Sequence, residues 1–480
     1  MSLVQLLILL AAALSTWLIG RFRRTASLRR PLMLLFSVGI IFWLQPALPI
    51  RGLDFWLPVG TLLIVLISWA VTAAPEERGV GKNLRPVLIL SGTVLALGLT
   101  RLFSATALIT PSRPPQVWLV ALILAIFCLV FLLTAKIKTP RKWIYALGTV
   151  GLILLLVFLK LPWLTLQFSQ LFRGLAGQST QLASALDIRW LGFSYVAFRL
   201  IHTLRDRQTG RLPGVSLEEY FIYILFFPAF TAGPIDRLER FLKDLRNPVS
   251  PSTAQLGEAG RRLVTGVAKK FILADLLAMV ALNGVNAAQV TATGWAWVLL
   301  YAYAFQILFD FSGYTDIAIG LGGIMGIHLP ENFNQPYLKP SLTQFWNNWH
   351  MTLTQWFRAY YFNPLTRAMR SAQKPAPVWV VILVTQLSTM VLIGLWHGIT
   401  LNFIAWGLWH GVGMFVNNRW SDLTRSWAAR LQEHPKLNFV SRVFSTILTF
   451  HFVVLGWVWF ALPSLNLSMQ SFFRLFGAGG

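Results

Sequence analysis

Residues 344–358 of this 480-residue chain read QFWNNWHMTLTQWFR, with a histidine near their centre. At the step of about 100° per residue of an α-helix, aromatic and aliphatic side chains share one arc: Phe345, Trp346, Trp349, Leu353, Trp356 and Phe357. The other arc is mostly polar: Asn347, Asn348, His350, Thr354, Gln355 and Arg358. In so apolar a chain, a polar helix face needs water, a cavity or an interface. We therefore predict one helix over 344–358 that does not cross a bilayer and turns His350 towards a solvated chamber.

The rest of the chain is typical of a polytopic membrane protein. It is 56% hydrophobic and 12% charged, and apolar runs of about 20 residues recur along it. We predict an all-α bundle of about 11–13 membrane segments, some of them re-entrant or bent, around a central chamber. The predicted spans are 3–20, 31–49, 53–74, 87–109, 116–135, 143–163, 188–204, 217–232, 262–288, 295–325, 376–395, 400–417 and 440–462.

The net charge of +24 is distributed by loop. Basic residues cluster after the first, third and fifth spans, whereas only Arg51 and Arg113 follow the second and fourth. By the positive-inside rule, this alternation places the N-terminus outside the cytoplasm and disfavours nucleic acid as a partner. The predicted cytoplasmic loops are 21–30, 75–86, 136–142, 205–215 and 418–437. The first run lacks a basic n-region and a cleavage site, so we expect a retained span.

Several classes of chemistry lack the residues they need. The single cysteine, Cys128, lies within a predicted span and can form neither an intrachain disulfide nor a cysteine-ligated metal site. The sequence has no G-x-S-x-G, H-E-x-x-H, Walker or dinucleotide-binding motif. Serine-esterase, zinc-protease and nucleotide-binding functions are therefore unsupported, and we predict no metal centre.

The character of the spans changes near Asp187. Before it the spans are Leu, Ile and Val helices, and after it polar and aromatic residues recur within or beside the apolar runs. We predict an N-terminal transmembrane scaffold over 1–186 and a catalytic core over 187–420. The remaining residues, 421–480, are predicted to form a cytoplasmic loop and the last span.

Two carboxylates, Asp310 and Asp316, fall in the last part of a long apolar run. Acids at membrane depth are costly and are usually functional or paired. Six residues turn a helix by about 240°, so the two are not expected to share one site, which disfavours retaining glycosidase chemistry. Lys269 and Lys270, at a predicted membrane boundary, are expected to be anchors that snorkel to the interface.

Residues 226–241, FFPAFTAGPIDRLERF, end an apolar run with prolines and glycine. They form either a helix end with a solvated basic loop or a re-entrant bend that holds Asp236 and Arg237 near a cavity mouth. His328 lies among loop residues after a later apolar run, and we expect a structural or interfacial role for it.

The tetrapeptide LWHG occurs twice, thirteen residues apart, around His397 and His410. On one continuous helix thirteen residues turn by about 220° net, so the two imidazoles would not face one chamber. His397 follows an apolar run where the span ends or bends, and an imidazole of pKa about 6.5 there could take and return a proton. His410 lies deep in the next run, and we predict a hydrogen bond from it to a neighbouring helix.

Four segments, in this order, resemble the membrane-bound O-acyltransferase (MBOAT) family: GPIDRLERF, GYTDIAIGLGGIMGIHLPENFNQPY, FWNNWHMTLTQWFR and LWHGITLNFIAWGLWHG. The resemblance covers roughly residues 187–420. Within the family, the chain is similar to the bacterial polymer-modifying branch, which acts in teichoic acid D-alanylation and alginate O-acetylation. One position departs from the pattern. Where those relatives commonly read F-R-D-Y, this chain has alanine at 359, so any partner contact made by that acid is absent here.

The resemblance implies a membrane-embedded O-acyltransferase with His397 as the essential catalytic histidine and His350 as the second active-site histidine. His397 would act as general base on a hydroxyl that attacks a thioester. Asn347, Asn348 and His350 would hold the donor or stabilise the oxyanion. Our full set of substrate-binding candidates is Asn347, Asn348, Trp346, Trp349, Arg358, Asp310, Asp316 and Asn402.

The resemblance also implies partners. An acetyl or D-alanyl type group would come from a cytoplasmic acyl-carrier protein or acyl-CoA, and the basic inner loops suit either anion. The acceptor would be an extracytoplasmic polysaccharide or cell-wall polymer, reached directly or through an acyl-relay protein. We expect no tightly bound cofactor and a multi-pass location among the lipids of the bacterial inner membrane. A transporter or flippase is the main alternative function, since intramembrane acids and broken spans suit such a protein. A third alternative, a structural membrane scaffold, explains the polar face around His350 poorly.

Overall fold

The computed structural model describes residues 2–22, 24–103, 109–136, 141–247 and 251–478. Throughout these residues the regular structure is helical and contains no strand, which confirms the predicted all-α class. The chain forms two compact units. One comprises Met1–Leu263 and Ala318–Pro330, and the other comprises Val264–Ile317 and Glu331–Gly480.

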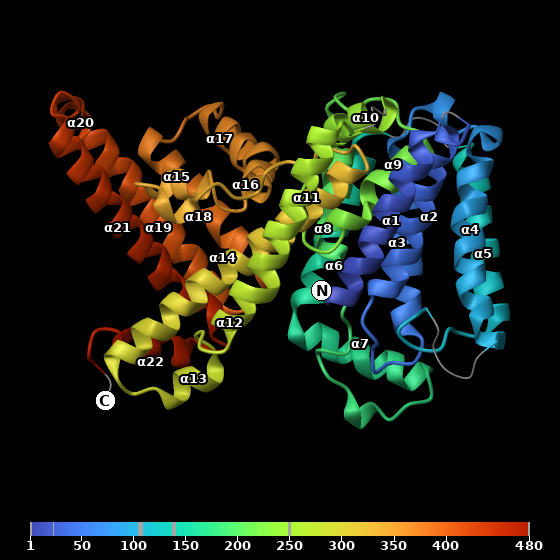
Figure 1. The fold of residues 1–480 in the computed structure, drawn as a ribbon, viewed down its shortest axis with the longest axis horizontal. Coiled ribbons are helices and arrows are strands. Elements are labelled where there is room, and N and C mark those ends of the chain that lie inside the picture. Colours follow the sequence, from blue (N-terminus) through green and yellow to red (C-terminus); the bar gives the residue numbers. More distant parts are fainter. Residues whose placement is uncertain (1, 23, 104–108, 137–140, 248–250, 479–480) are drawn as a thin grey trace. The chain divides into compact units, whose positions relative to one another are not determined.

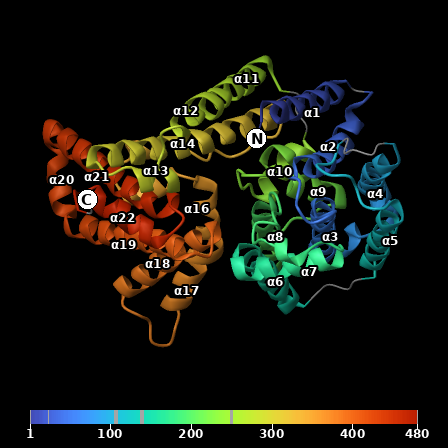
Figure 2. The ribbon, with the colours of Figure 1, turned by 90° about the horizontal axis from the view of Figure 1, so that it is seen from below.

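The first unit is a bundle of helices from the N-terminal half of the chain (Figure 1). Its helices are α1 (Leu3–Arg21), α2 (Arg29–Leu44), α3 (Leu53–Thr72), α4 (Val80–Phe103), α5 (Val117–Thr134), α6 (Lys142–Lys160), α7 (Pro162–Leu175), α8 (Phe193–Gln208), α9 (Leu217–Leu225), α10 (Leu238–Arg246) and most of α11 (Thr253–Val267). The core lies between α2, α3, α8 and α9, where Phe42, Trp69 and Tyr220 are fully buried. The pair α4 and α5 lies side by side at the edge of this unit (Figure 2).

The second unit holds both candidate catalytic histidines, His350 and His397. Its helices are α12 (Asp275–Ala278), α13 (Gly284–Gln289), most of α14 (Thr293–Ile324), α15 (Leu342–Trp346), α16 (Met351–Phe357), α17 (Asn363–Arg370), α18 (Val378–His397), α19 (Leu401–Leu423), α20 (Arg425–Gln432), α21 (Pro435–Ala461) and α22 (Leu465–Arg474). Two π-helical stretches, Ala268–Ala274 and Arg358–Phe362, lead into α12 and α17. Helices α18 and α19 form a tight antiparallel hairpin, and α21 packs on α19.

Nine helices in the described residues are long and apolar enough to cross a membrane: Leu3–Arg21, Ala26–Leu44, Leu53–Thr72, Val80–Phe103, Val117–Thr134, Lys142–Lys160, Thr293–Ile324, Val378–His397 and Pro435–Ala461. Large apolar side chains stay exposed along them, as with Trp118 (62%) and Leu129 (56%) on α5. Apolar surface on this scale suits lipid rather than water. The chain is therefore a multi-pass helical membrane protein.

The four other predicted spans do not meet that standard of length and composition. The run at 188–204 becomes α8, which is 16 residues long and carries Arg199 and His202. The run at 217–232 becomes the nine-residue α9 followed by a 3-10 turn, so it is bent. The run at 262–288 carries two lysines in its π-helix, and the run at 400–417 becomes α19, which contains polar residues. Parts of the predicted span 87–109 and loop 136–142, namely 104–108 and 137–140, lie outside the described residues.

Candidate functional site

The segment 344–358 is not one helix. Helix α15 ends at Trp346, a turn follows, and α16 begins at Met351. His350 occupies the turn with φ 42° and ψ 53°, a left-handed conformation that costs a non-glycine residue about 1–2 kcal/mol. The prediction of a continuous helix is therefore wrong.

The break changes which side of the segment His350 faces. The aromatic and aliphatic arc is confirmed, because five of its members are buried: Phe345, Trp346, Trp349, Leu353 and Phe357. Asn347, Gln355 and Arg358 on the polar arc are exposed, but His350 is only 3% exposed. The prediction that His350 shares the polar face is wrong, because the turn directs its side chain inward.

His350 is held by side chains from three other segments of the second unit. Its Nδ1 lies 3.1 Å from Oδ1 of Asn332, which follows α14 in the chain. The ring of Phe311, on α14, packs edge-on against the imidazole at 4.7 Å between centroids. The ring of Trp396, on α18, lies 6.3 Å away. The site is thus assembled by tertiary contacts rather than by one amphipathic helix.

His397 is the last residue of α18 and is half-buried. Its ring contacts four aromatic rings at centroid distances of 4.5–5.9 Å: Trp396, Phe403, Trp406 and Phe460. The chain turns at once, and Thr400 caps α19 by accepting a hydrogen bond from the Phe403 N–H. Gly394 makes the hairpin possible, because a Cβ there would lie 2.2 Å from the Phe403 carbonyl oxygen.

The structure brings His350 and His397 into one aromatic cluster. Trp396 contacts both imidazoles, with centroid distances of 6.3 Å to His350 and 4.5 Å to His397. Sequence separation alone did not predict this proximity. Because Trp396 and His397 are neighbours at the end of α18, the placement of α18 fixes the relation between the two histidines.

His410 lies in the middle of α19 and is fully buried. Trp406 lies 5.0 Å from its ring and also contacts His397, so the rotation expected for one continuous helix does not apply across the break after α18. Among the described residues neither ring nitrogen of His410 has a hydrogen-bond partner. The predicted bond to a neighbouring helix is therefore wrong. The facing residue on α21 is Gly456, which offers no side chain.

The polar substrate-binding candidates already have protein partners. Arg358 donates from Nη2 to Oδ1 of Asn347 at 2.6 Å, and both are exposed. Asn348 donates to the carbonyl of Gln344 at 2.8 Å, within its own turn. Asn402 is buried and donates from Nδ2 to the carbonyl of Leu462 and to Ser468, so it ties α19 to α22.

The aromatic candidates Trp346 and Trp349 lie within the buried cluster. Trp346 packs on the His410 ring at 5.2 Å. Trp349 packs on Trp457 at 5.2 Å and is stacked on Tyr337 at 5.7 Å. Both side chains therefore pack within the aromatic cluster that surrounds the histidines.

Asp310 and Asp316 pair with different lysines, as their spacing predicted. Lys269 Nζ lies 2.7 Å from Asp316 Oδ2, and Lys270 pairs with Asp310. The π-helix that carries both lysines lies along α14 (Figure 2), so the prediction of snorkelling anchors is wrong. The ion pairs account for acids in an apolar helix without a substrate.

In the first unit, the segment before Asp236 is a buried bend rather than a solvated loop. The Asp236 carboxylate accepts from the Arg237 N–H and pairs with Arg240 at 2.7 Å, whereas both arginines are exposed. His328 is exposed and pairs with Asp244 on α10 at 3.1 Å, which agrees with the structural role expected for it.

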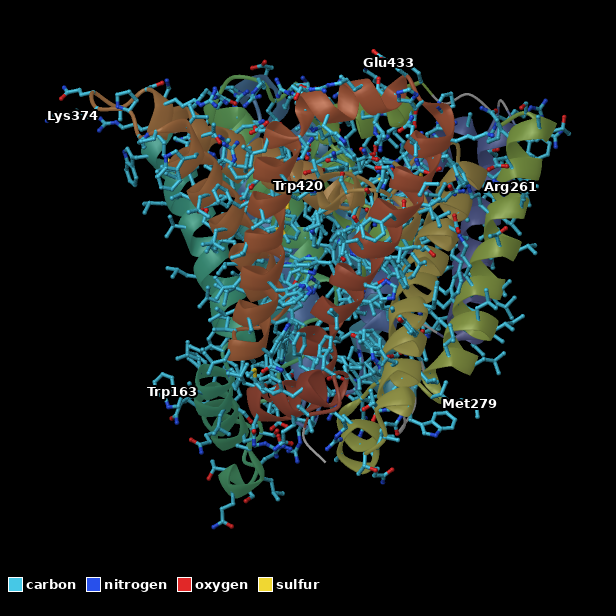
Figure 3. All side chains as sticks on the ribbon, turned by 90° about the vertical axis from the view of Figure 1, so that its left-hand side faces the viewer. Trp163, Arg261, Met279, Lys374, Trp420 and Glu433 are labelled. Carbon is cyan, nitrogen blue, oxygen red and sulfur yellow. The ribbon has the colours of Figure 1, made fainter. Side chains whose placement is uncertain are left out.

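A groove of about 750 Å³ runs beside α19 and α21. Its lining is apolar and includes Leu408, Val416, Phe452 and Trp420, the last of which is labelled in Figure 3. Neither His350 nor His397 lines it, so this groove is not the chamber predicted around the histidines.

Asn332 is the residue that the sequence analysis missed. It lies in the quoted segment PENFN but was given no role, because eighteen residues separate it from His350. Asparagine in a loop before an aromatic segment carries no signal by itself. A reader of the sequence alone would need the tertiary pairing of the two segments to find it.

The family model of the membrane-bound O-acyltransferases, MBOAT, matches residues 94–458. The chain belongs to this family, and the aromatic cluster that contains His350 and His397 lies within the matched residues.

Curated relatives fall in two groups. The chain is 34% identical over 290 residues to a probable alginate O-acetylase AlgI of Pseudomonas syringae pv. tomato, covering 60% of this chain and 52% of the relative. It is 32% identical over 240 residues to a teichoic acid D-alanyltransferase of Streptococcus thermophilus, covering 48% and 58%. It is 33% identical over 282 residues to that of Bacillus subtilis, covering 57% and 69%. The chain thus spans about half the length of the first two relatives.

Proposed function

We propose that this protein is an O-acyltransferase that moves an acetyl or D-alanyl type group from a cytoplasmic thioester to hydroxyls of an extracytoplasmic polysaccharide or cell-wall polymer. Membership of the MBOAT family and similarity to relatives named for alginate and teichoic acid support it. The observation that carries it is the shared contact of His350 and His397 with Trp396, because it gathers two imidazoles in one aromatic cluster.

In the proposed reaction His397 takes the proton of the acceptor hydroxyl while that oxygen attacks the thioester carbonyl carbon. The C–S bond then breaks, and the proton passes from His397 to the leaving thiolate, so the products are an ester and a thiol. A positioned general base contributes about 10²–10⁴-fold to such a step. The half-buried position of His397 at a helix end suits a group that must meet both substrates.

The partners and location belong to the same proposal. The donor is an acyl-carrier protein or acyl-CoA, attracted by basic cytoplasmic loops, and an acyl-relay protein can pass the group to the polymer. No tightly bound cofactor takes part. The location is the bacterial inner membrane, with 1–186 as scaffold, 187–420 as catalytic core and 421–480 as loop and last span.

The decisive test compares His397→Ala with the unaltered protein in detergent, using acyl-CoA and an acyl-carrier thioester in turn. We expect ester formation and thiol release to fall together by about 100-fold or more, with donor binding retained. His434→Ala, which changes an exposed histidine before α21, is the matched control and keeps full activity. A transporter would instead move its substrate without releasing thiol, and that result would overturn the proposal.

The proposed topology has a separate test. In a Cys128→Ser background, cysteine placed at position 113 should react with a membrane-impermeant reagent from outside, and cysteine at position 138 only after permeabilisation. The reverse labelling pattern would contradict the orientation and with it a cytoplasmic donor.

A further inference from the structure

Asn332 and His350 belong to two segments, the loop at 331–334 and the turn at 347–350, that are joined by backbone hydrogen bonds. The Met351 N–H donates to the Asn332 carbonyl at 2.9 Å, and the Asn334 N–H donates to the Asn348 carbonyl at 3.0 Å. The Asn332 side chain is fully buried between them. The pairing explains how a left-handed His350 is tolerated, since its neighbours on both sides are hydrogen-bonded.

The orientation of the Asn332 amide follows from its partners. Thr352 donates to this side chain twice, from its backbone N–H at 3.1 Å and from its hydroxyl at 2.9 Å. A backbone N–H can only donate, so the amide atom that faces it is the oxygen.

The same oxygen decides the tautomer of His350. His350 Nδ1 lies 3.1 Å from Asn332 Oδ1, and an amide oxygen can only accept a hydrogen bond. Nδ1 therefore carries the proton. A neutral imidazole has one N–H, so Nε2 is left with its lone pair. Burial lowers the pKa of His350 to about 3, which keeps the ring neutral at physiological pH.

We propose that Asn332 is a positioning residue that holds His350 as the Nδ1–H tautomer, in which Nε2 carries no proton. This inference rests on the proposed function and deepens it. A ring in this state has no proton at Nε2, so it does not stabilise an oxyanion. In the proposed reaction the transferred proton is carried by His397.

The tautomer can be read without turnover. The protein has seven histidines, so ¹⁵N-histidine labelling with His350→Gln as the assignment variant isolates the His350 signals. We expect a protonated Nδ1 and an unprotonated Nε2, unchanged between pH 5 and 8. A protonated Nε2, or titration near the ordinary pKa of about 6.5, would overturn the inference. Because this readout needs no acyl transfer, it stands even where the proposed activity fails.

Two substitutions at position 332 separate positioning from simple structural support. Asn332→Ala removes the acceptor, so we expect the Nδ1–H preference to disappear and kcat to fall by about 100-fold, with a smaller change in KM. Asn332→Asp keeps an acceptor oxygen and adds a negative charge, which raises the pKa of His350. It should retain the tautomer and move the acid limb of the kcat profile to higher pH, because the ring must stay unprotonated at Nε2.

Asn334→Ala is the matched control, since Asn334 is exposed and only its backbone pairs with the histidine segment. It should leave both the tautomer and the pH profile unchanged. If both Asn332 variants lower the melting temperature while the tautomer and pH profile stay as in the unaltered protein, Asn332 only supports the fold and the inference is wrong. Should Asn332→Ala fail to fold, the pH profile of Asn332→Asp decides whether Asn332 positions His350 or only supports the fold.

Discussion

The two LWHG repeats have the same four residues and different surroundings. His397 ends α18 and is half-buried beside a turn, whereas His410 lies in the middle of α19 with no exposed surface. The residue facing His410 is Gly456 on α21, where a Cβ would lie 2.8 Å from its Nε2. The two histidines therefore differ in exposure because they occupy different positions along their helices. A reactant can reach a side chain at a helix end, but it cannot reach one enclosed between two packed helices.

The largest expected difference between the repeats is in turnover. His397→Ala should abolish acyl transfer, a loss of about 10²–10⁴-fold, and should change the melting temperature little because the ring is only half-buried. Acyl transfer and thermal melting in detergent measure the two effects on the same preparation. Wild-type turnover in this variant would show that the proposed general base lies elsewhere.

His410→Ala should show the opposite balance. The imidazole fills space among Trp346, Trp406 and Phe452, so its removal leaves a cavity and should destabilise the protein by about 2–4 kcal/mol. Turnover at a temperature below melting should stay close to that of the unaltered protein. A stable but inactive His410→Ala protein would reverse the assignment of the two repeats.

Substitution of the glycine after each histidine should give a smaller difference between the two repeats. A Cβ at Gly411 would lie 2.9 Å from the Leu387 Cα, whereas a Cβ at Gly398 would lie 2.6 Å from the Phe403 ring. Backbone cannot move aside as a ring can, so Gly411→Ala should cost about 1–3 kcal/mol and lower the melting temperature more than Gly398→Ala.

The effect on activity should run the other way. Gly398→Ala displaces Phe403, which is stacked on the His397 ring at 5.9 Å, and should reduce kcat. Steady-state kinetics and melting curves of the two variants, measured side by side, test whether Gly411→Ala loses more stability and Gly398→Ala loses more activity. Equal losses of activity in both variants would mean that Phe403 does not help to place His397.

Much of the fold could be predicted from the sequence, because apolar runs of span length leave few alternatives in a membrane. The buried arc from Phe345 to Phe357 was also predictable. Its helical periodicity persists in α15 and α16, on both sides of the break. These features depend on residues that are close together in the chain.

The features that were missed depend on distant partners. Asn332 holds the turn at His350. Lys269 and Lys270 form ion pairs with Asp316 and Asp310 on α14, which lie 47 and 40 residues later in the chain. The buried state of His410 depends on Gly456 of α21. A local pattern cannot reveal such pairs, so the helix break, the ion pairs and the unbonded histidine required the structure.

The pairing of the π-helix with α14 has a consequence for biosynthesis. Ribosomes make Lys269 and Lys270 before Asp310 and Asp316, so each acid emerges after its partner. An unpaired acid at the centre of a span costs about 2.5–3.5 kcal/mol during insertion by the translocon. Both lysines are therefore already made when α14 inserts, and pairing with them offsets that cost.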